Sequence, residues 1–445
     1  MNALEVLREA AEPKPVVAII GGAVAGCEAA AACATRGAIP VVFEQGDRPY
    51  GKIEDGLPRW HVKLRDKEYQ KINNNLGGDD VIFVPHTEVG GALSWQELYR
   101  DVGFSAIVLA NGAWHDRGLP IEGADAYEGR GLVYQNPFVY WFNHYEDEGY
   151  DGPVFEVPDG TIIVGGGLAS IDVVKIVNLE VYARVLRERG LEVDIVTMEV
   201  KGIPRILEAH GITPEELGVE GCTLYYRRSK EDMPLASLDN PTPAQLEKLR
   251  LARTKIMDRV IRKYLVKFEE LSRPVGTIVE GDRLVGIQFQ KTEIVDGRVK
   301  GLEGTEFEVR SPMIISSIGS IPKPIEGIPT KGELYHFENW DTGELHELPG
   351  VFGLGNVLTG KGNIKDSREN AIEIIENVVA AYLGVGDEPD EAPGANSAQA
   401  EEIADEATAG TPMTTEAMKA LADRIQKRHA EVGYRDYTSW IAAHT

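Results

Sequence analysis

The stretch VVAIIGGAVAG occupies residues 16–26, and a second stretch of the same plan, TIIVGGGLAS, occupies residues 161–170. Each begins with a short apolar run, continues into a glycine turn and ends in residues typical of a helix. This order predicts a buried parallel strand followed by a helix whose N-terminus faces a pyrophosphate. One such unit indicates one bound dinucleotide, so the pair indicates two dinucleotides held face to face.

Length and composition narrow the class of protein. The chain has 445 residues, more than one hydrophobic core usually covers, so we expect two or three domains. No apolar stretch approaches the ~20 residues that cross a bilayer, and residues 1–15 do not have the pattern of a signal peptide. The net charge of −25 argues against nucleic acids and anionic membranes as partners.

The three cysteines offer little redox or metal chemistry. Cys27 and Cys33 fall on one predicted helix, about 9 Å apart along its axis, which is too far for a disulfide bond, and Cys222 stands alone. The spacing fits neither a zinc site nor an iron–sulfur cluster. We therefore expect no metal, an organic redox cofactor and a cytoplasmic location.

The first glycine unit continues into a predicted helix, residues 25–35, and a second strand, residues 38–43. Glu44 ends that strand, where a carboxylate accepts hydrogen bonds from an adenosine ribose and repels a 2′-phosphate. Ala23 replaces the middle glycine of the motif, and its small methyl group should be tolerated. The residues predicted to hold this dinucleotide are Gly21, Ala23, Gly26 and Glu44.

The second unit has two candidates for the residues that would bind the adenosine ribose. We call this place, at the end of the neighbouring strand, the adenosine corner. A predicted strand at residues 192–198 is ended by Glu199, which would favour NAD. A later strand, residues 222–226, is ended by Arg227 and Arg228, which would favour NADP because guanidinium groups bind phosphate bidentately. The residues themselves leave both corners open.

Strand ends after residues 104–109 and 311–318 mark where we expect the chain to cross between domains. Residues 386–406 hold eight acidic residues and no basic one, which is typical of a disordered linker. The expected parts are a first domain of residues 1–112 and 322–384, a second domain of residues 113–321, an acidic linker of residues 385–413 and a helical tail of residues 414–445.

Residues 245–267 predict a helix with eight Lys or Arg and two acidic residues. On so acidic a chain this helix is the candidate dock for an acidic partner. The sequence has no Gly-x-Ser-x-Gly motif and no redox cysteine pair, so we do not expect a disulfide reductase.

These features together resemble the adrenodoxin reductase-like ferredoxin–NADP reductases, and also the small subunit of bacterial glutamate synthase, over roughly residues 15–383. Residues 49–51 with His61 are similar to the segment along the isoalloxazine, and residues 165–172 are similar to the NADPH pyrophosphate turn. Tyr226-Arg227-Arg228-Ser229 matches the arginine pair that holds the 2′-phosphate, which favours NADPH while NADH stays possible. Residues 355–364 resemble the second FAD motif, with Asn356 and the run GKGN as departures.

The resemblance implies an α/β fold with two Rossmann-like, three-layer (ββα) domains, the second inserted in the first, plus a C-terminal helical tail. It implies an FAD-dependent oxidoreductase that takes a hydride from NADPH and passes electrons to ferredoxin or another iron–sulfur protein. The alternatives are a glutamate-synthase-like reductase subunit that feeds a larger partner, and a non-catalytic dinucleotide-binding subunit. The implied catalytic residues are His61 and Asp239. The implied cofactor-binding residues are Gly21, Ala23, Gly26, Glu44, Gly51, Gly165, Gly167, Leu168, Ala169, Arg227, Arg228, Gly355, Asn356, Gly362, Asn363 and Ile364.

Overall fold

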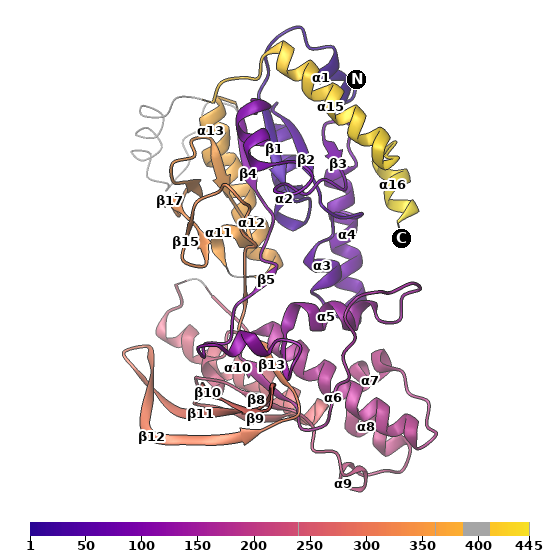
Figure 1. The fold of residues 1–445 in the computed structure, drawn as a ribbon, viewed down its shortest axis with the longest axis vertical. Helices are drawn as coiled ribbons and strands as arrows, with labels where there is room; N and C mark the ends of the chain where they lie inside the picture. The colour runs from indigo at the N-terminus through magenta and orange to yellow at the C-terminus, as the bar shows by residue number, and fades with distance from the viewer. Residues whose placement is uncertain (239, 361, 386–409, 445) are drawn as a thin grey trace. The chain divides into compact units, whose positions relative to one another are not determined.

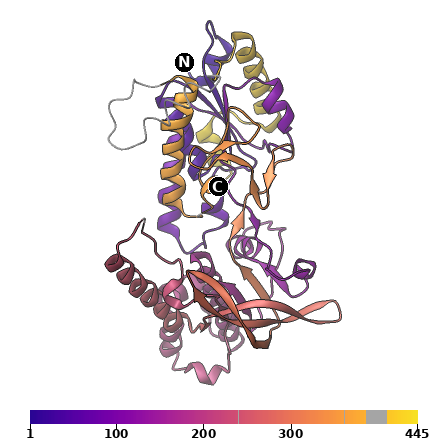
Figure 2. The ribbon, with the colours of Figure 1, turned by 90° about the vertical axis from the view of Figure 1, so that its left-hand side faces the viewer.

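A computed structural model describes residues 1–238, 240–360, 362–385 and 410–444, which divide into two units. Unit 1 consists of Met1–Glu54, Val62–His115 and Ser320–Thr445, and unit 2 of Asp55–His61 and Asp116–Gly319. Figures 1 and 2 show the ribbon from two directions. Most of the acidic stretch expected to be a linker, and also Asp239, lie outside the described residues.

Unit 1 is built on a seven-stranded sheet with the order β17-β18-β19-β4-β1-β2-β3. Its strands are β1 (Val16–Ile20), β2 (Ile39–Phe43), β3 (Ile82–Val84), β4 (Ala106–Leu109), β17 (Phe337–Asn339), β18 (Glu344–Leu345) and β19 (Val351–Gly353). The five strands from β19 to β3 are parallel, and β17 and β18 pair antiparallel. Every residue of β1 is buried, as expected of a central parallel strand that is covered on both faces.

The helices of unit 1 cover this sheet. The alanine-rich α2 (Val24–Thr35) follows β1 and contacts α4 (Val62–Leu76) and α12 (Ile364–Ile374). Alanine side chains let these helices pack closely, and eight residues of α2 are buried. The remaining short elements are α1 (Ala3–Arg8), α3 (Lys52–Asp55), η1 (Glu97–Asp101), β15 (Thr330–Lys331), β16 (Leu334–Tyr335), α11 (Asn356–Thr359), η4 (Ile375–Val379) and α13 (Ala380–Leu383).

The tail forms α15 (Thr415–Val432) and α16 (Tyr437–Ala443), which lie beside α1 and β3 (Figure 1). The Thr414 hydroxyl caps α15 by accepting from the Ala417 amide, and one face of the helix joins the core of unit 1. The Nε2–H of His429 donates to the Phe83 carbonyl of β3 at 2.9 Å. The tail is therefore an integral layer of unit 1.

Unit 2 contains a five-stranded parallel sheet with the order β6-β13-β7-β8-β9. Its strands are β6 (Leu132–Tyr134), β7 (Ile162–Gly165), β8 (Thr223–Tyr225), β9 (Lys267–Glu269) and β13 (Ile314–Ser317). Beside it lies an antiparallel sheet of β10 (Ser272–Glu280), β11 (Arg283–Val295) and β12 (Arg298–Arg310), whose long ribbon is plain in Figure 2. The main helices are α5 (Gln135–His144), α6 (Leu168–Glu188) and α10 (Pro243–Tyr264). The smaller elements are η2 (Ala124–Tyr127), α7 (Ile195–Lys201), α8 (Ile203–Ala209), α9 (Pro214–Leu217) and η3 (Lys230–Asp232), and β5 (His115–Asp116) and β14 (Ser320–Ile321) form a separate pair.

The strand predicted at residues 192–198 is wrong, because this segment forms α7. The Asp194 carboxylate caps the helix by accepting from the Thr197 amide at 2.7 Å, and this cap outweighs the strand preference of the β-branched residues that follow. The basic helix is confirmed as α10, but it ends earlier than predicted, at Tyr264, because the C-cap Leu265 has φ 54°, and Lys267 belongs to β9. No helix in the described part of the chain is long and apolar enough to span a membrane.

Candidate functional site

The first glycine turn is shaped by close backbone approach. Gly21 has φ 96°, and a Cβ there would lie 2.8 Å from the Ala110 carbonyl oxygen. A Cβ at Gly26 would lie 1.8 Å from the Gly21 carbonyl oxygen, so only glycine lets α2 start this close to β1. Ala23 is the N-cap residue of α2 and supplies no capping side chain. The amides of this turn therefore rely on other partners.

Glu44 is one such partner. Its carboxylate is buried at the end of β2 and accepts from the Gly22 amide at 2.9 Å and from the Gly46 amide at 3.0 Å. This places a negative charge at the carboxyl edge of the parallel sheet, beside the glycine turn, which is the corner where an adenosine ribose is bound in such folds. The carboxylate also fixes the loop that follows β2.

Two distant segments meet this turn. Gly51, with φ 49°, lies so close that a Cβ on it would stand 3.0 Å from the Cβ of Ala23. Gly355, with φ 62°, would place a Cβ 2.5 Å from the Cβ of Ala25. Glycine at both positions thus lets the early loop and the late segment of unit 1 approach the first turn, and these predicted residues are brought together.

Polar side chains hold the backbone of the late segment, residues 355–364. The Asn356 side-chain oxygen accepts from the Gly362 amide at 2.9 Å, so this amide holds the turn. Asn363 caps α12 by accepting from the Asp366 amide at 2.7 Å, and Ile364 is the first residue of that helix. The Gly355 amide donates to Asn370 at 2.7 Å. The polar side chains of this region therefore hold its backbone in place by accepting hydrogen bonds from its amides.

The second glycine turn, in unit 2, has two crowded positions and one open position. A Cβ at Gly165 would lie 2.4 Å from the Ser317 carbonyl oxygen, and one at Gly166 would overlap the Tyr226 ring at 2.1 Å. Gly167 has nothing within 4 Å of such a Cβ and is the N-cap of the 21-residue α6. Leu168 and Ala169 after it are exposed. The N-terminus of α6 is thus open to an anionic group.

Arg227 and Arg228 follow β8, which pairs in parallel with β7, with Tyr225 opposite Val164. Arg228 donates to the Gly297 carbonyl at 2.8 Å, and the Arg227 side chain is exposed. In a parallel sheet the end of the neighbouring strand is the adenosine corner of the glycine turn. The strand order therefore puts the arginine pair at the end of the strand next to the glycine turn.

Glu199, the other candidate for the adenosine corner, lies in α7, and its carboxylate is bound by other side chains of unit 2. Its carboxylate accepts from the Tyr264 hydroxyl at 2.7 Å and pairs with the Lys175 ammonium at 3.2 Å. Burial opposes its ionisation, yet the Tyr264 hydrogen bond and the Lys175 charge hold the pKa of Glu199 below its ordinary value. This carboxylate is part of the internal polar packing of unit 2.

His61 belongs to unit 2, where its Nε2 lies 3.6 Å from the Asp172 carboxylate. The same carboxylate lies 3.3 Å from the Lys175 ammonium, which stands 5.3 Å from the centre of the Trp60 ring. The buried atoms Trp60 Nε1 and His61 Nε2 have no hydrogen-bond partner among the described residues. Sequence reasoning missed Trp60 and Lys175, although the aromatic pair Trp60-His61 in a turn-rich loop was a usable signal.

Comparisons with known proteins agree with this architecture. No family model matches the chain. It is 24% identical over 362 residues to the "Glutamate synthase [NADPH] small chain" of Mycobacterium tuberculosis, covering 78% of this chain and 63% of the relative. It is 23% identical over 331 residues to the mitochondrial "NADPH:adrenodoxin oxidoreductase" of Arabidopsis thaliana, covering 66% and 65%. The chain thus spans less than two thirds of the length of these curated relatives.

A shorter match, 32% identical over 169 residues, links the chain to cindoxin reductase of Citrobacter braakii, covering 37% of this chain and 35% of the relative. Among solved structures, Mycobacterium tuberculosis FprA in complex with NADPH superposes with a TM-score of 0.63 at 19% identity, covering 94% of this chain and 91% of FprA. The predicted α/β fold with parallel sheets is confirmed. The chain is therefore a homologue of the glutamate synthase small chains and the adrenodoxin reductase-like proteins, and it shares the two-dinucleotide-domain fold of FprA.

Proposed function

We propose that this chain is an FAD-dependent oxidoreductase that takes a hydride from NADPH and passes electrons to a separate carrier, ferredoxin or another small iron–sulfur protein. Unit 1 is then the FAD-binding domain, and unit 2, inserted within it, is the NADPH-binding domain. The observation that carries the proposal is the opposite charge of the two adenosine corners. Glu44 repels a 2′-phosphate in unit 1, whereas Arg227 and Arg228 attract one in unit 2. The names of the homologues, which include NADPH, support this assignment.

The residues of unit 1 fit FAD. Gly21 and Gly26 leave a turn that a Cβ would fill, Glu44 supplies the ribose acceptor, and Gly51 and Gly355 bring two further backbone segments to the same turn. Bound FAD would supply an acceptor for a hydride and a donor of single electrons. The chain itself would bind and orient the group.

The residues of unit 2 fit NADPH. Gly167 and the exposed first residues of α6 leave free space and amide groups for a pyrophosphate. Trp60 Nε1, a buried donor with no hydrogen-bond partner among the described residues, is of the kind that a bound ligand completes. We propose that Asp172 orients the His61 imidazole, and that His61 holds a proton at Nε2 near the reacting atoms.

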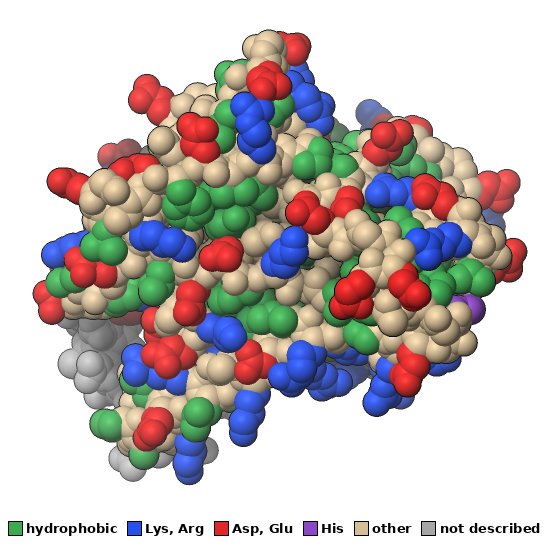
Figure 3. Space-filling view, turned by 90° about the horizontal axis from the view of Figure 1, so that it is seen from below, with side chains coloured by type: hydrophobic (Ala, Val, Ile, Leu, Met, Phe, Trp, Pro, Cys, Tyr) green, Lys and Arg blue, Asp and Glu red, His purple; other side chains and the backbone are tan. Residues whose placement is uncertain are grey.

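A basic hollow in unit 2 is the proposed dock for an acidic carrier. It measures about 330 Å³, and five of its lining residues are cationic: Lys201, Arg205, Arg259, Arg262 and Lys263. Burial, aided by these like charges, lowers the pKa of Lys263 despite the nearby Glu199. Figure 3 shows one face of the molecule, where Lys and Arg gather along the lower edge and acidic side chains are scattered. On a chain with net charge −25, such a cluster favours an acidic protein surface.

The flavin test is spectroscopic. The purified chain should be yellow, and anaerobic NADPH should bleach its band near ~450 nm, because a bound flavin takes up the hydride. A colourless chain that stays empty when FAD is added would rule out the proposal. Colour that NADPH and NADH both fail to bleach would favour the non-catalytic alternative, for which Ala23 and Asn356 are the sequence hints.

The dock is tested with charge reversals on α10. The double variant Arg259→Glu with Arg262→Glu alters the hollow, whereas Lys248→Glu with Lys255→Glu changes the net charge equally outside it. We expect the first pair to raise the KM for an acidic ferredoxin about tenfold, and the second pair to change it far less. Equal effects would indicate only long-range attraction. A stable complex with a larger redox subunit, and no activity with ferredoxin, would favour the glutamate-synthase-like alternative.

A further inference from the structure

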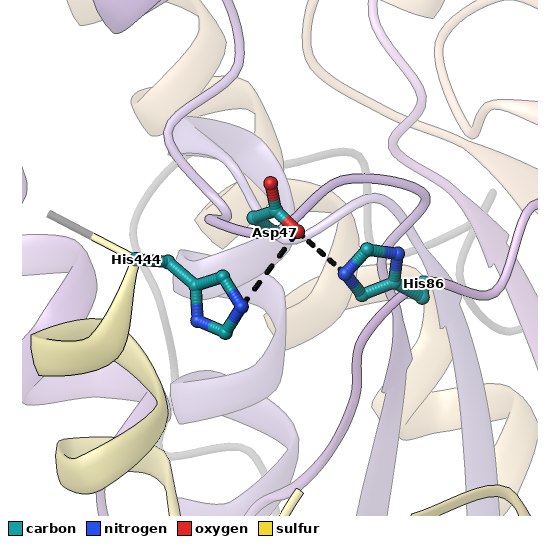
Figure 4. A group of neighbouring side chains, drawn as sticks. All are labelled: Asp47, His86 and His444. Carbon is teal, nitrogen blue, oxygen red and sulfur yellow. Dashed lines mark ion pairs between the residues drawn. The ribbon is translucent and has the colours of Figure 1, made fainter. Parts of the chain in front are cut away.

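Three side chains of unit 1 converge on one point from segments far apart in the sequence (Figure 4). Asp47 follows β2, His86 follows β3 and His444 follows α16. One ligand-type atom from each residue lies within 4.8 Å of the other two. Oδ1 of Asp47 is 2.5 Å from Nε2 of His86 and 3.9 Å from Nε2 of His444. Two imidazoles and one carboxylate therefore face a common centre.

The backbone holds His86 in an uncommon conformation. Its φ of 52° lies in the left-handed region, which residues other than glycine rarely adopt. The His86 amide donates to the Gly46 carbonyl at 3.4 Å, and the Arg428 guanidinium donates to the His86 carbonyl and to the Thr87 hydroxyl. Such conformations persist where the surroundings over-determine them, and they cluster at functional sites.

The hydrogen bonds of His444 fix which nitrogen faces the centre. Its Nδ1 lies 2.8 Å from the Trp440 carbonyl oxygen, and because a carbonyl only accepts, Nδ1 carries the hydrogen. Nε2 is then the ring nitrogen on the side of Asp47. A histidine that donates through one nitrogen to a backbone carbonyl and offers the other is the usual arrangement of a metal ligand. Trp440 also donates its indole N–H to the Asp47 carbonyl at 2.5 Å.

We propose that Asp47, His86 and His444 bind a divalent transition-metal ion, with Zn²⁺ as the best fit. Imidazole nitrogen and carboxylate oxygen bind zinc at about 2.0–2.2 Å, which separates tetrahedral ligands by about 3.3–3.5 Å. The separations from Asp47 Oδ1, 2.5 and 3.9 Å, straddle this value, and partly exposed side chains can rotate to meet it. Two nitrogen ligands disfavour Mg²⁺ and Ca²⁺, which prefer oxygen.

The site would join the tail to the sheet. The metal would link α16 to the loops after β2 and β3, and the first of these loops is the one that Glu44 fixes through the Gly46 amide. Because the ligands come together only in the folded unit, binding should raise the melting temperature. The inference rests on unit 1 alone and does not depend on the proposed redox function.

Zinc binding can be measured on the full chain after treatment with EDTA and removal of the chelator. Trp440 lies beside both imidazoles, with its ring centre 5.5 Å from that of His86 and 4.1 Å from that of His444, so its fluorescence should report the metal. Titration with ZnCl₂ by calorimetry should show one tight site and a higher melting temperature. The variants His86→Ala and His444→Ala should each weaken binding by about tenfold or more.

A matched control is available in unit 1. His336 and His346 have ring centres 4.2 Å apart, and Glu338 and Glu347 pair with His346, so this group is a competitor for added zinc. His346→Ala should leave the tight site unchanged, and His444→Cys should restore binding because thiolate is also a zinc ligand. The proposal is overturned if His86→Ala and His444→Ala bind zinc like the unaltered chain while retaining its melting temperature in EDTA. It is equally overturned if His346→Ala is the variant that loses the metal.

Discussion

Nε2 of His61 lies 3.6 Å from Oδ1 of Asp172, a contact between the short segment Asp55–His61 and the second turn of α6. The pairing places a titratable imidazole beside the open N-terminus of α6, where unit 2 offers its glycine turn. A carboxylate that orients an imidazole is a recurrent device for holding a proton in one position. The contact supports the role proposed for His61.

His61→Ala should slow flavin reduction by NADPH by roughly 10²-fold, because the proton-holding group is lost. Stopped-flow absorbance under anaerobic conditions measures this rate. The melting temperature should change little, since the His61 side chain is 31% exposed. His210→Ala, at an exposed histidine of unit 2, serves as the control. An unchanged reduction rate in His61→Ala would assign the residue a structural role only.

Arg227→Ala should weaken NADPH binding by on the order of tenfold to a hundredfold, the value of a charge-assisted hydrogen bond to phosphate, and should leave NADH binding unchanged. The ratio of kcat/KM for the two nucleotides measures the effect. Glu199→Gln is the informative control, because Glu199 is already engaged by Tyr264 and Lys175. A shift in preference with Glu199→Gln and none with Arg227→Ala would return the adenosine corner to Glu199.

Two neighbouring glycines of unit 2 should respond differently to the same added methyl group. Gly165→Ala places a Cβ 2.4 Å from the Ser317 carbonyl oxygen and should destabilise unit 2 by about 1–3 kcal/mol. Gly167→Ala meets no atom within 4 Å and has an ordinary φ of −89°, so the fold should be kept. Its methyl group should instead obstruct the pyrophosphate and weaken NADPH binding. Thermal unfolding and nucleotide titration separate the two effects, and equal unfolding of both variants would contradict this assignment.

The pair His144 and Asp55 predicts a pH dependence of stability. The hydrogen bond to the Asp55 carboxylate at 3.1 Å raises the pKa of His144, burial opposes this rise, and Asp147 adds to it. Because the folded pKa exceeds the unfolded value of about 6.5, the stabilisation is complete below that pH and is lost as pH rises through the folded pKa. Asp55→Asn should therefore cost more stability at about pH 6 than at about pH 9. Urea unfolding at both pH values measures this, and Asp151→Asn, at an exposed acidic residue, should show no such difference.

The sequence predicted the elements around the two glycine turns well, because their patterns are local. The apolar run before Gly21 is buried throughout, and the alanine-rich residues after it form α2 within a residue of the predicted start. The error at residues 192–198 is also local, since Asp194 acts as a helix cap before residues with strand preference. In both cases a few neighbouring residues decide the outcome.

The remaining features depend on contacts between distant residues, which no spacing pattern records. Asp47, His86 and His444 come together only because α15 and α16 fold back over unit 1. Asn356, which departs from the second FAD motif, accepts from the Gly362 amide in the turn that follows. His61 was expected beside the flavin, whereas the structure groups it with unit 2 and Asp172.

The tail helices α15 and α16 cover one edge of the seven-stranded sheet. Among the described residues, β3 is the last strand of the seven-stranded sheet, and such an edge can recruit a strand from another molecule. His429 occupies the Phe83 carbonyl, and Tyr434 and Tyr437 pack their rings on the Phe83 side chain. α15 and α16 thus cover the edge of β3, where another molecule could otherwise add a strand. We expect a chain shortened before Thr415 to expose this edge and to self-associate through β3.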